Sequence, residues 1–146
     1  MQPAIQGADG LLLLLKVTAL GSQRGQLAGG VVSVNEAAPS LTVTVERQAL
    51  WTVMRLLGEL DQRSHGGLVD CVRSIFDEVD PPLICVDLNG LQFCDSSGVA
   101  CLVMTWRAAR ERGGALILLR PVGQVARLMS LVGLAEVLPV VDEVPG

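Results

Sequence analysis

The residues with the clearest chemical potential are Asp95, Ser96 and Ser97, which stand between two apolar segments of the chain. A carboxylate and two hydroxyls at the start of a helix can accept hydrogen bonds from the first backbone N–H groups, which have no partner within the helix. The same N–H groups and the helix dipole favour a phosphate. A serine at this place can therefore cap a helix and also accept a phosphoryl group.

The neighbouring segments predict how this site is held. Residues 83–88 are almost continuously apolar, which is typical of a buried strand, and the Asn89-Gly90 pair is expected to break that strand. Residues 97–112 carry the pattern of a helix. The site is therefore expected where a strand passes into a helix N-terminus.

Upstream of this site the pattern predicts a hairpin and a helix. Residues 41–45 and 51–57 are rich in strand-forming residues, with a turn expected within 46–50. Apolar residues recur at helical spacing over 66–79, and the proline pair at 81–82 ends that helix.

Downstream, residues 115–119 are expected to form another buried strand. Pro121 is expected to open a third helix that Gly133 ends, and residues 137–141 to form a final strand. The order β-β-α-β-α-β-α-β predicts an α/β fold, because alternating strands and helices imply right-handed crossovers between parallel strands. The leading hairpin makes the predicted sheet mixed but mostly parallel.

Three segments of the chain resemble the STAS-domain family of anti-sigma factor antagonists. They are Asp-Ser-Ser-Gly at 95–98 after an Asp-Leu-x-Gly-Leu-x-Phe strand end, Gly-Glu-Leu-Asp at 58–61, and Leu-Val-Gly-Leu at 131–134 with Val-Leu-Pro-Val at 137–140. The match covers residues 41–142, and the combination is specific although Asp-Ser-Ser-Gly alone is not. The resemblance implies a STAS-like sheet with its helices largely on one side.

The resemblance also implies a function and a set of site residues. The unphosphorylated family member binds an anti-sigma factor that is also a serine kinase, and thereby frees a sigma factor. The kinase phosphorylates the serine directly after the aspartate, here Ser96, and a phosphoserine phosphatase reverses the reaction. Asp61, Asp95, Ser97 and Gly98 are expected to belong with Ser96 to the partner-binding surface.

Alternatives to these roles stay open. Ser96 could serve only as a helix cap, and Asp61 could be a solvated loop carboxylate. Ser97 fits less well as phosphoacceptor, because a residue one place further into the helix is expected to bond to the backbone. Residues 62–67 are polar and glycine-rich and depart from the family pattern, which puts the partner contacts of that loop in doubt. The runner-up function is a STAS binding subunit of a transporter or sensory complex.

The sequence argues against an enzyme. The nucleophile elbow of a hydrolase needs glycine two residues before its serine, but Cys94 stands there for Ser96 and Asp95 for Ser97. The chain has a single histidine, His65, and lacks a phosphate-binding Gly-Lys-Ser/Thr loop. No catalytic residue and no cofactor are therefore expected.

A metal site and nucleic-acid binding are also not expected. The chain has four cysteines without a CxxC pair, and three of them lie in apolar runs, which predicts buried free thiols: Cys71, Cys85, Cys94 and Cys101. The net charge of −4 and the scarcity of aromatic residues argue against a nucleic-acid partner.

The chain of 146 residues, of which 50% are hydrophobic, suits a single domain. Residues 1–40 are expected to be a flexible N-terminal extension and residues 41–146 the STAS domain; within the extension, 11–20 could add a strand or helix and 31–34 a small strand. The leucine run at 11–15 is shorter than the roughly 20 apolar residues of a membrane helix, and no basic segment precedes it. A cytoplasmic protein without a membrane span is therefore expected.

Overall fold

The computed structural model describes residues 31–33 and 41–145 of the chain. The strands are β1 (Val31–Ser33), β2 (Leu41–Gln48), β3 (Trp51–Leu60), β4 (Leu83–Cys94), β5 (Ala115–Leu119) and β6 (Val140–Val141). The helices are α3 (His65–Glu78), α4 (Ser96–Glu111), α5 (Gly123–Leu131) and the short 3-10 helix η1 (Leu134–Glu136). The expectations for residues 1–30 and 34–40 lie outside the described residues, whereas the small strand expected at 31–34 is present as β1.

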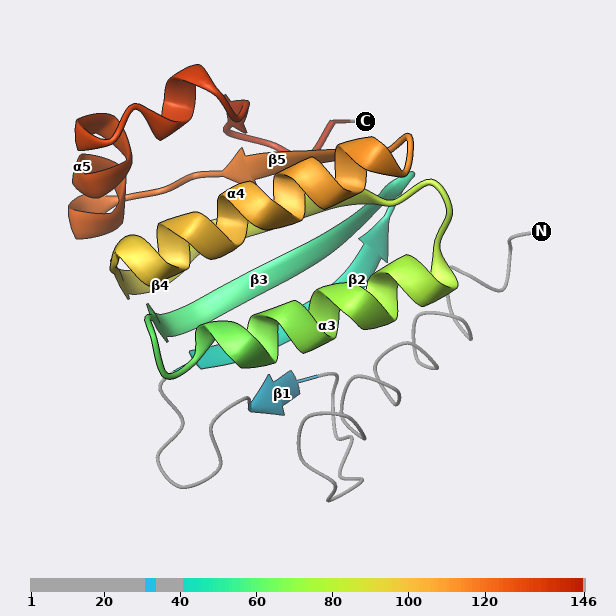
Figure 1. Ribbon diagram of the computed structural model, residues 1–146, viewed down its shortest axis with the longest axis horizontal. Coiled ribbons are helices and arrows are strands. Elements are labelled where there is room, and N and C mark those ends of the chain that lie inside the picture. The colour runs from blue at the N-terminus through green and yellow to red at the C-terminus, as the bar shows by residue number, and fades with distance from the viewer. Residues whose placement is uncertain (1–30, 34–40, 146) are drawn as a thin grey trace.

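The strands form a six-stranded sheet in which the order in space follows the order in the chain, and Figure 1 labels β1 to β5 of this sheet. β1 and β2 pair antiparallel, as do β2 and β3. β4 is parallel to both β3 and β5, and β5 is parallel to β6. The predicted mixed, mostly parallel sheet is therefore confirmed.

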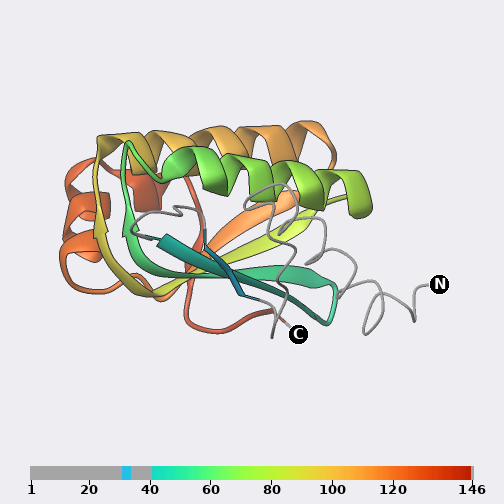
Figure 2. The same ribbon diagram turned by 90° about the horizontal axis from the view of Figure 1, so that it is seen from below.

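The long helices α3 and α4 lie side by side on one face of the sheet, and α5 packs near the end of β4 (Figures 1 and 2). The main core fills the space between this face and the helices, with large side chains such as Leu56, Ile75 and Leu102 fully buried. A smaller apolar cluster around Val53 and Cys85 covers the opposite face. The expected placement of the helices largely on one side is confirmed.

The predicted break of the strand at Asn89-Gly90 is wrong, because β4 continues through both residues to Cys94. Asp87 pairs with Arg55 but Gly90 pairs with Leu57, so an irregularity in β4 takes up the extra residue. A side chain at residue 90 would overlap the Leu57 side chain. Glycine here permits the close approach of β3, and the strand can run on to the site.

Several predicted element ends also differ from the structure. The hairpin turn is confined to Ala49 and Leu50, because β2 extends to Gln48 opposite Trp51. Pro121 does not open α5, whose N-cap is Val122. Of the expected strand at 137–141, the last two residues form β6, because η1 and the turn after it occupy the preceding residues.

Candidate functional site

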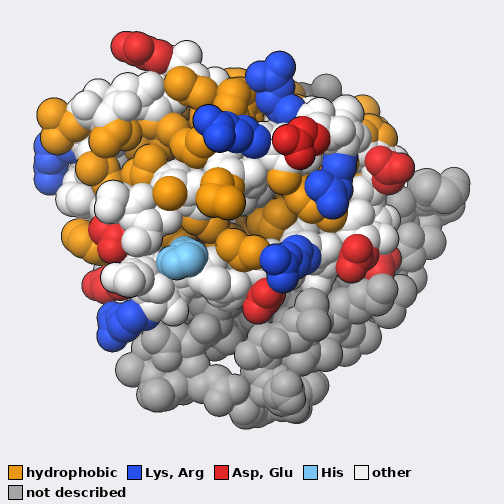
Figure 3. Space-filling view, in the orientation of Figure 1, with side chains coloured by type: hydrophobic (Ala, Val, Ile, Leu, Met, Phe, Trp, Pro, Cys, Tyr) orange, Lys and Arg blue, Asp and Glu red, His pale blue; other side chains and the backbone are white. Residues whose placement is uncertain are grey.

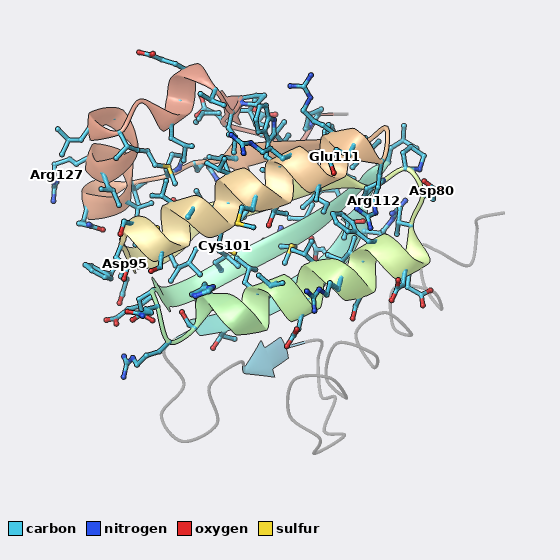
Figure 4. The ribbon with its side chains drawn as sticks, viewed as in Figure 1. Asp80, Asp95, Cys101, Glu111, Arg112 and Arg127 are labelled. Atoms are coloured by element: carbon cyan, nitrogen blue, oxygen red, sulfur yellow. The ribbon has the colours of Figure 1, made fainter. Side chains whose placement is uncertain are left out.

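The site lies where the parallel strands β3 and β4 end. Leu60 pairs with Cys94 at the end of the two strands, and the backbone N–H of Asp95 donates to the carbonyl of Leu60 at 3.3 Å. Asp61 and Asp95 therefore follow neighbouring strand ends at the same edge of the sheet. Figure 4 shows Asp95 at the beginning of α4.

Asp95 is the N-cap of α4, and its Oδ1 atom accepts a hydrogen bond from the backbone N–H of Gly98 at 3.0 Å. Ser96 is the first residue of the helix and is exposed, while Ser97 is half-buried. The possibility that Ser96 caps the helix is therefore wrong, and the predicted start of the helix at residue 97 lies one residue too late. Within the described part of the chain, neither serine hydroxyl makes a hydrogen bond, so the expected bond between Ser97 and the backbone is not found.

Gly98 fixes the position of α4 against the sheet. It is buried, and a Cβ atom there would lie 2.7 Å from both the Leu60 carbonyl oxygen and Cys94 Sγ. A backbone oxygen cannot move aside cheaply, so this close packing requires glycine. Gly98 therefore holds the exposed Ser96 in place rather than forming a surface itself.

Asp61 organises the loop that leads from β3 into α3. Its Oδ1 atom accepts hydrogen bonds from the backbone N–H groups of Arg63 at 3.0 Å and Ser64 at 3.1 Å, and from the Ser64 hydroxyl at 3.3 Å. Its Oδ2 atom lies 3.6 Å from the Arg63 guanidinium, and its side chain is 13% exposed. Asp61 is therefore not a freely solvated carboxylate.

Two effects oppose each other at Asp61. Burial acts to raise the pKa of the Asp61 carboxyl, but the hydrogen bonds from Arg63 and Ser64 and the charge of Arg63 outweigh it and hold that pKa below its ordinary value. Asp61 is therefore negatively charged at neutral pH, at the same edge of the sheet as the start of α4.

Two residues that support the site carry little signal in the sequence. Ser64 is fully buried and its hydroxyl donates to the carbonyl of Glu59 at 2.9 Å, which ties the loop back to β3. The side-chain amide of Gln124, on α5, accepts from the backbone N–H of Cys94 at 3.1 Å and donates to its carbonyl at 3.2 Å. Gln124 thus takes the place of a strand partner at the end of β4. Only the tertiary arrangement reveals this role.

The four cysteines are free and buried. Burial is the main cause that raises the pKa of Cys71 and Cys94 to about 12 and that of Cys85 and Cys101 to about 11. The thiols are therefore protonated at neutral pH and poor nucleophiles. Among the described residues, no group of His, Cys, Asp and Glu side chains could hold a metal ion, and no helix is long and apolar enough to cross a membrane.

Comparison with known proteins agrees with this geometry. A family model described as "Mlab, STAS domain" matches residues 43–141. Over 107 residues the chain is 29% identical to an anti-sigma F factor antagonist of Paenibacillus polymyxa, a match that covers 70% of this chain and 88% of that protein.

Solved structures with a similar fold include the anti-sigma factor antagonist SpoIIAA in its unphosphorylated form, with 28% identity and a TM-score of 0.58 over 69% of this chain and 89% of that one. The phosphorylated form of Bacillus SpoIIAA gives 27% identity and a TM-score of 0.54 over 69% and 92% of the two chains. An anti-sigma factor antagonist from Mycobacterium paratuberculosis, at 23% identity, has a TM-score of 0.63 over 72% and 88%. These similarities confirm the predicted fold.

Proposed function

Since the chain belongs to the STAS domain family, we propose that it is an anti-sigma factor antagonist switched by phosphorylation of Ser96. One observation carries the proposal: the Ser96 hydroxyl is exposed at the start of α4, while the capping hydrogen bond is made by Asp95. The hydroxyl is thus available to a kinase without loss of the cap. The name of the Paenibacillus relative and the two SpoIIAA structures support the assignment.

In this proposal the unphosphorylated chain binds an anti-sigma factor that is also a serine kinase, and the sigma factor is released. The kinase transfers the γ-phosphoryl group of ATP to Ser96 Oγ, whose proton is lost as ADP leaves. A phosphoserine phosphatase later removes the group by hydrolysis. Because the reaction needs ATP and the partner controls a sigma factor, we propose that the protein acts in the cytoplasm.

Electrostatics explains how phosphorylation would end the complex. A phosphoserine carries about 1.5 to 2 negative charges, and here it would lie beside Asp95, at the edge of the sheet where the ionised Asp61 follows the neighbouring strand. Removing such a cluster from water in an interface is costly unless the partner supplies matching positive charge. The N–H groups at the start of α4 stabilise the same phosphate in the free protein, so the switch acts on the interface and not on the fold.

The remaining site residues have supporting roles in this proposal. Ser97 contributes half-buried surface next to Ser96, and Gly98 and Asp95 fix the first turn of α4. Asp61 shapes the neighbouring loop of the partner-binding surface. The protein is a binding regulator without catalytic residues or a cofactor of its own.

Phosphopeptide mapping tests the proposal. The full chain and its Ser96→Ala and Ser97→Ala variants are incubated with the anti-sigma factor kinase and ATP. We expect one phosphoryl group per chain on Ser96, unchanged in Ser97→Ala and absent in Ser96→Ala. A group on Ser97 or Thr105, or full labelling of Ser96→Ala, would contradict it. If none of the three proteins is phosphorylated, the STAS binding subunit of a transporter or sensory complex would be the better assignment.

A further inference from the structure

An apolar groove runs between α3 and α4 on the helix face of the molecule. It has a volume of about 540 Å³, a size typical of binding sites. Figure 3 shows hydrophobic side chains gathered along α4 and between the two helices. The apolar residues that line the groove are Val69, Val72, Phe76, Ala100, Met104 and Ala108.

The two ends of the groove have different chemistry. His65 and Ser97 line one end, next to the proposed phosphorylation site. Arg73 and Arg112 line the groove further along the helices, and Arg112 lies at the far end of α4 (Figure 4). From Ser97 to Arg112 the helix rises about 22 Å at 1.5 Å per residue. The groove therefore joins the phosphorylation site to a basic end about four helical turns away.

Within the part of the chain that the structure describes, the charges of the basic end are not neutralised. Neither Arg73 nor Arg112 forms an ion pair with a described residue, and none of the described residues that line the groove carries a carboxylate. The Arg112 guanidinium lies over the Phe76 ring at 4.3 Å from its centroid. This contact holds the charge at the edge of the apolar surface.

An exposed apolar residue marks the middle of the groove. The Met104 side chain is 68% exposed although it stands between apolar neighbours. Exposed apolar surface of this kind marks interaction sites, and the flexible methionine side chain adapts well to a partner. A partner that fits here presents apolar side chains along its length and a carboxylate where it meets the two arginines.

We propose that the groove receives an amphipathic helix of the anti-sigma factor, with an acidic residue that pairs with Arg73 and Arg112. The inference rests on the proposed function and extends the partner surface from Ser96 along α3 and α4. A helix is the expected occupant, because a groove between two helices accepts the apolar ridge of a third. Since Ser97 lines the groove, a phosphate on the adjacent Ser96 acts on the end of the bound helix and promotes its release.

Titration calorimetry of the full-length protein with the anti-sigma factor tests this inference. Met104→Glu places a charge in the groove, and Arg73→Glu reverses the charge at its basic end. Leu131→Glu, at a residue 84% exposed on α5, and Arg107→Glu, at an exposed arginine of α4 outside the groove, are the matched controls. All four residues are exposed, and melting curves check that each variant is folded.

We expect each groove variant to weaken binding by about tenfold or more and each control to change it less than about twofold. Unchanged affinity of either groove variant, beside a wild type that binds and is phosphorylated on Ser96, would overturn the groove proposal and leave the proposed function intact. A wild type that neither binds the anti-sigma factor nor is phosphorylated by it would instead overturn the proposed function.

Discussion

The first turns of α3 and α4 are held at the same edge of the sheet in different ways. Each helix follows one of two neighbouring parallel strands, and in each case an aspartate accepts hydrogen bonds from backbone N–H groups. At α4 the aspartate is the N-cap itself, and Gly98 packs against the end of β3. At α3 a loop separates Asp61 from the helix, and a Cβ atom at Gly66 would meet no atom within 4 Å.

The difference lies in how closely each helix start packs against the sheet, since a Cβ atom would clash at Gly98 but not at Gly66. The tight start of α4 holds Ser96 in one position relative to the sheet, as a residue that a kinase must recognise requires. The start of α3 leaves open space at Gly66 and lies within a polar, glycine-rich segment at residues 62–67. We infer that the α4 start carries the chemistry of the switch and that the α3 start tolerates substitution at Gly66.

Substitution of the two glycines gives the largest expected effect on this comparison. Gly98→Ala introduces a Cβ atom 2.7 Å from the Leu60 carbonyl oxygen, and we expect it to lower the free energy of unfolding by about 2 to 3 kcal/mol. Gly66→Ala is the matched control, and we expect it to be neutral or to stabilise by up to about 1 kcal/mol, because its site is open and alanine favours the helix.

Urea unfolding of both variants measures this difference. Equal stability of Gly98→Ala and the wild type would mean that α4 is not locked against β3, and the contrast between the two helix starts would fail.

Removal of the charge of Asp61 tests the α3 side. The fold lowers the pKa of this carboxyl below its ordinary value of 3.8, so the ionised form stabilises the native state. This contribution is fully present above pH 4 to 5 and is lost as the pH falls through the lowered pKa. At pH 7 we expect Asp61→Asn to cost about 1 kcal/mol, and the difference from the wild type to shrink towards pH 2.

Chemical unfolding of the wild type and Asp61→Asn at a series of pH values checks this prediction. A difference that stays constant between pH 7 and pH 2 would show that the charge of Asp61 does not stabilise the loop.

Alanine substitutions at the start of α4 separate the cap from the phosphoacceptor. Asp95→Ala removes the cap and is expected to cost about 1 kcal/mol. Ser96→Ala removes an exposed hydroxyl without a hydrogen bond, and its cost is expected to stay below about 0.5 kcal/mol. Thermal melting compares the two variants. If Ser96→Ala lowered the stability more than Asp95→Ala, Ser96 and not Asp95 would be the N-cap.

Deletion of the N-terminal residues 1–40 is expected to have the smallest effect of the changes considered. We propose that residues 1–40 are an extension and residues 41–146 the STAS domain, although β1 adds a short antiparallel edge to β2. Deletion of residues 1–40 should leave a cooperative thermal transition and partner binding largely intact, because the described core is built from later elements. Loss of that transition would make the extension part of the fold.

Local signals in the sequence predict much of the site. The apolar run before Asp95 and the polar residues at the helix start predict a strand that passes into α4, and the structure confirms both elements. The choice of Asp95 over Ser96 as N-cap is not predicted, because both side chains are good caps and the backbone geometry decides between them.

Features of the structure that depend on residues distant in the sequence cannot be predicted from these local signals. The Asn89-Gly90 pair is typical of a turn, yet it stays within β4 because the strand pairs with β3 both before and after it. The requirement for glycine at residue 98 follows from the position of the Leu60 carbonyl. Likewise, Gln124 is recognised as a clamp on Cys94 only when α5 is seen against the end of β4.

The most direct test of the central claim is the affinity of the anti-sigma factor for the phosphorylated and unphosphorylated protein, measured by titration calorimetry. We expect phosphorylation of Ser96 to weaken binding by about 2 kcal/mol or more, as for a buried charge left unpaired. Ser96→Ala, even after incubation with kinase and ATP, should bind like the unphosphorylated wild type. Equal affinity of all three forms would contradict the account, because Ser96 would then carry no switch.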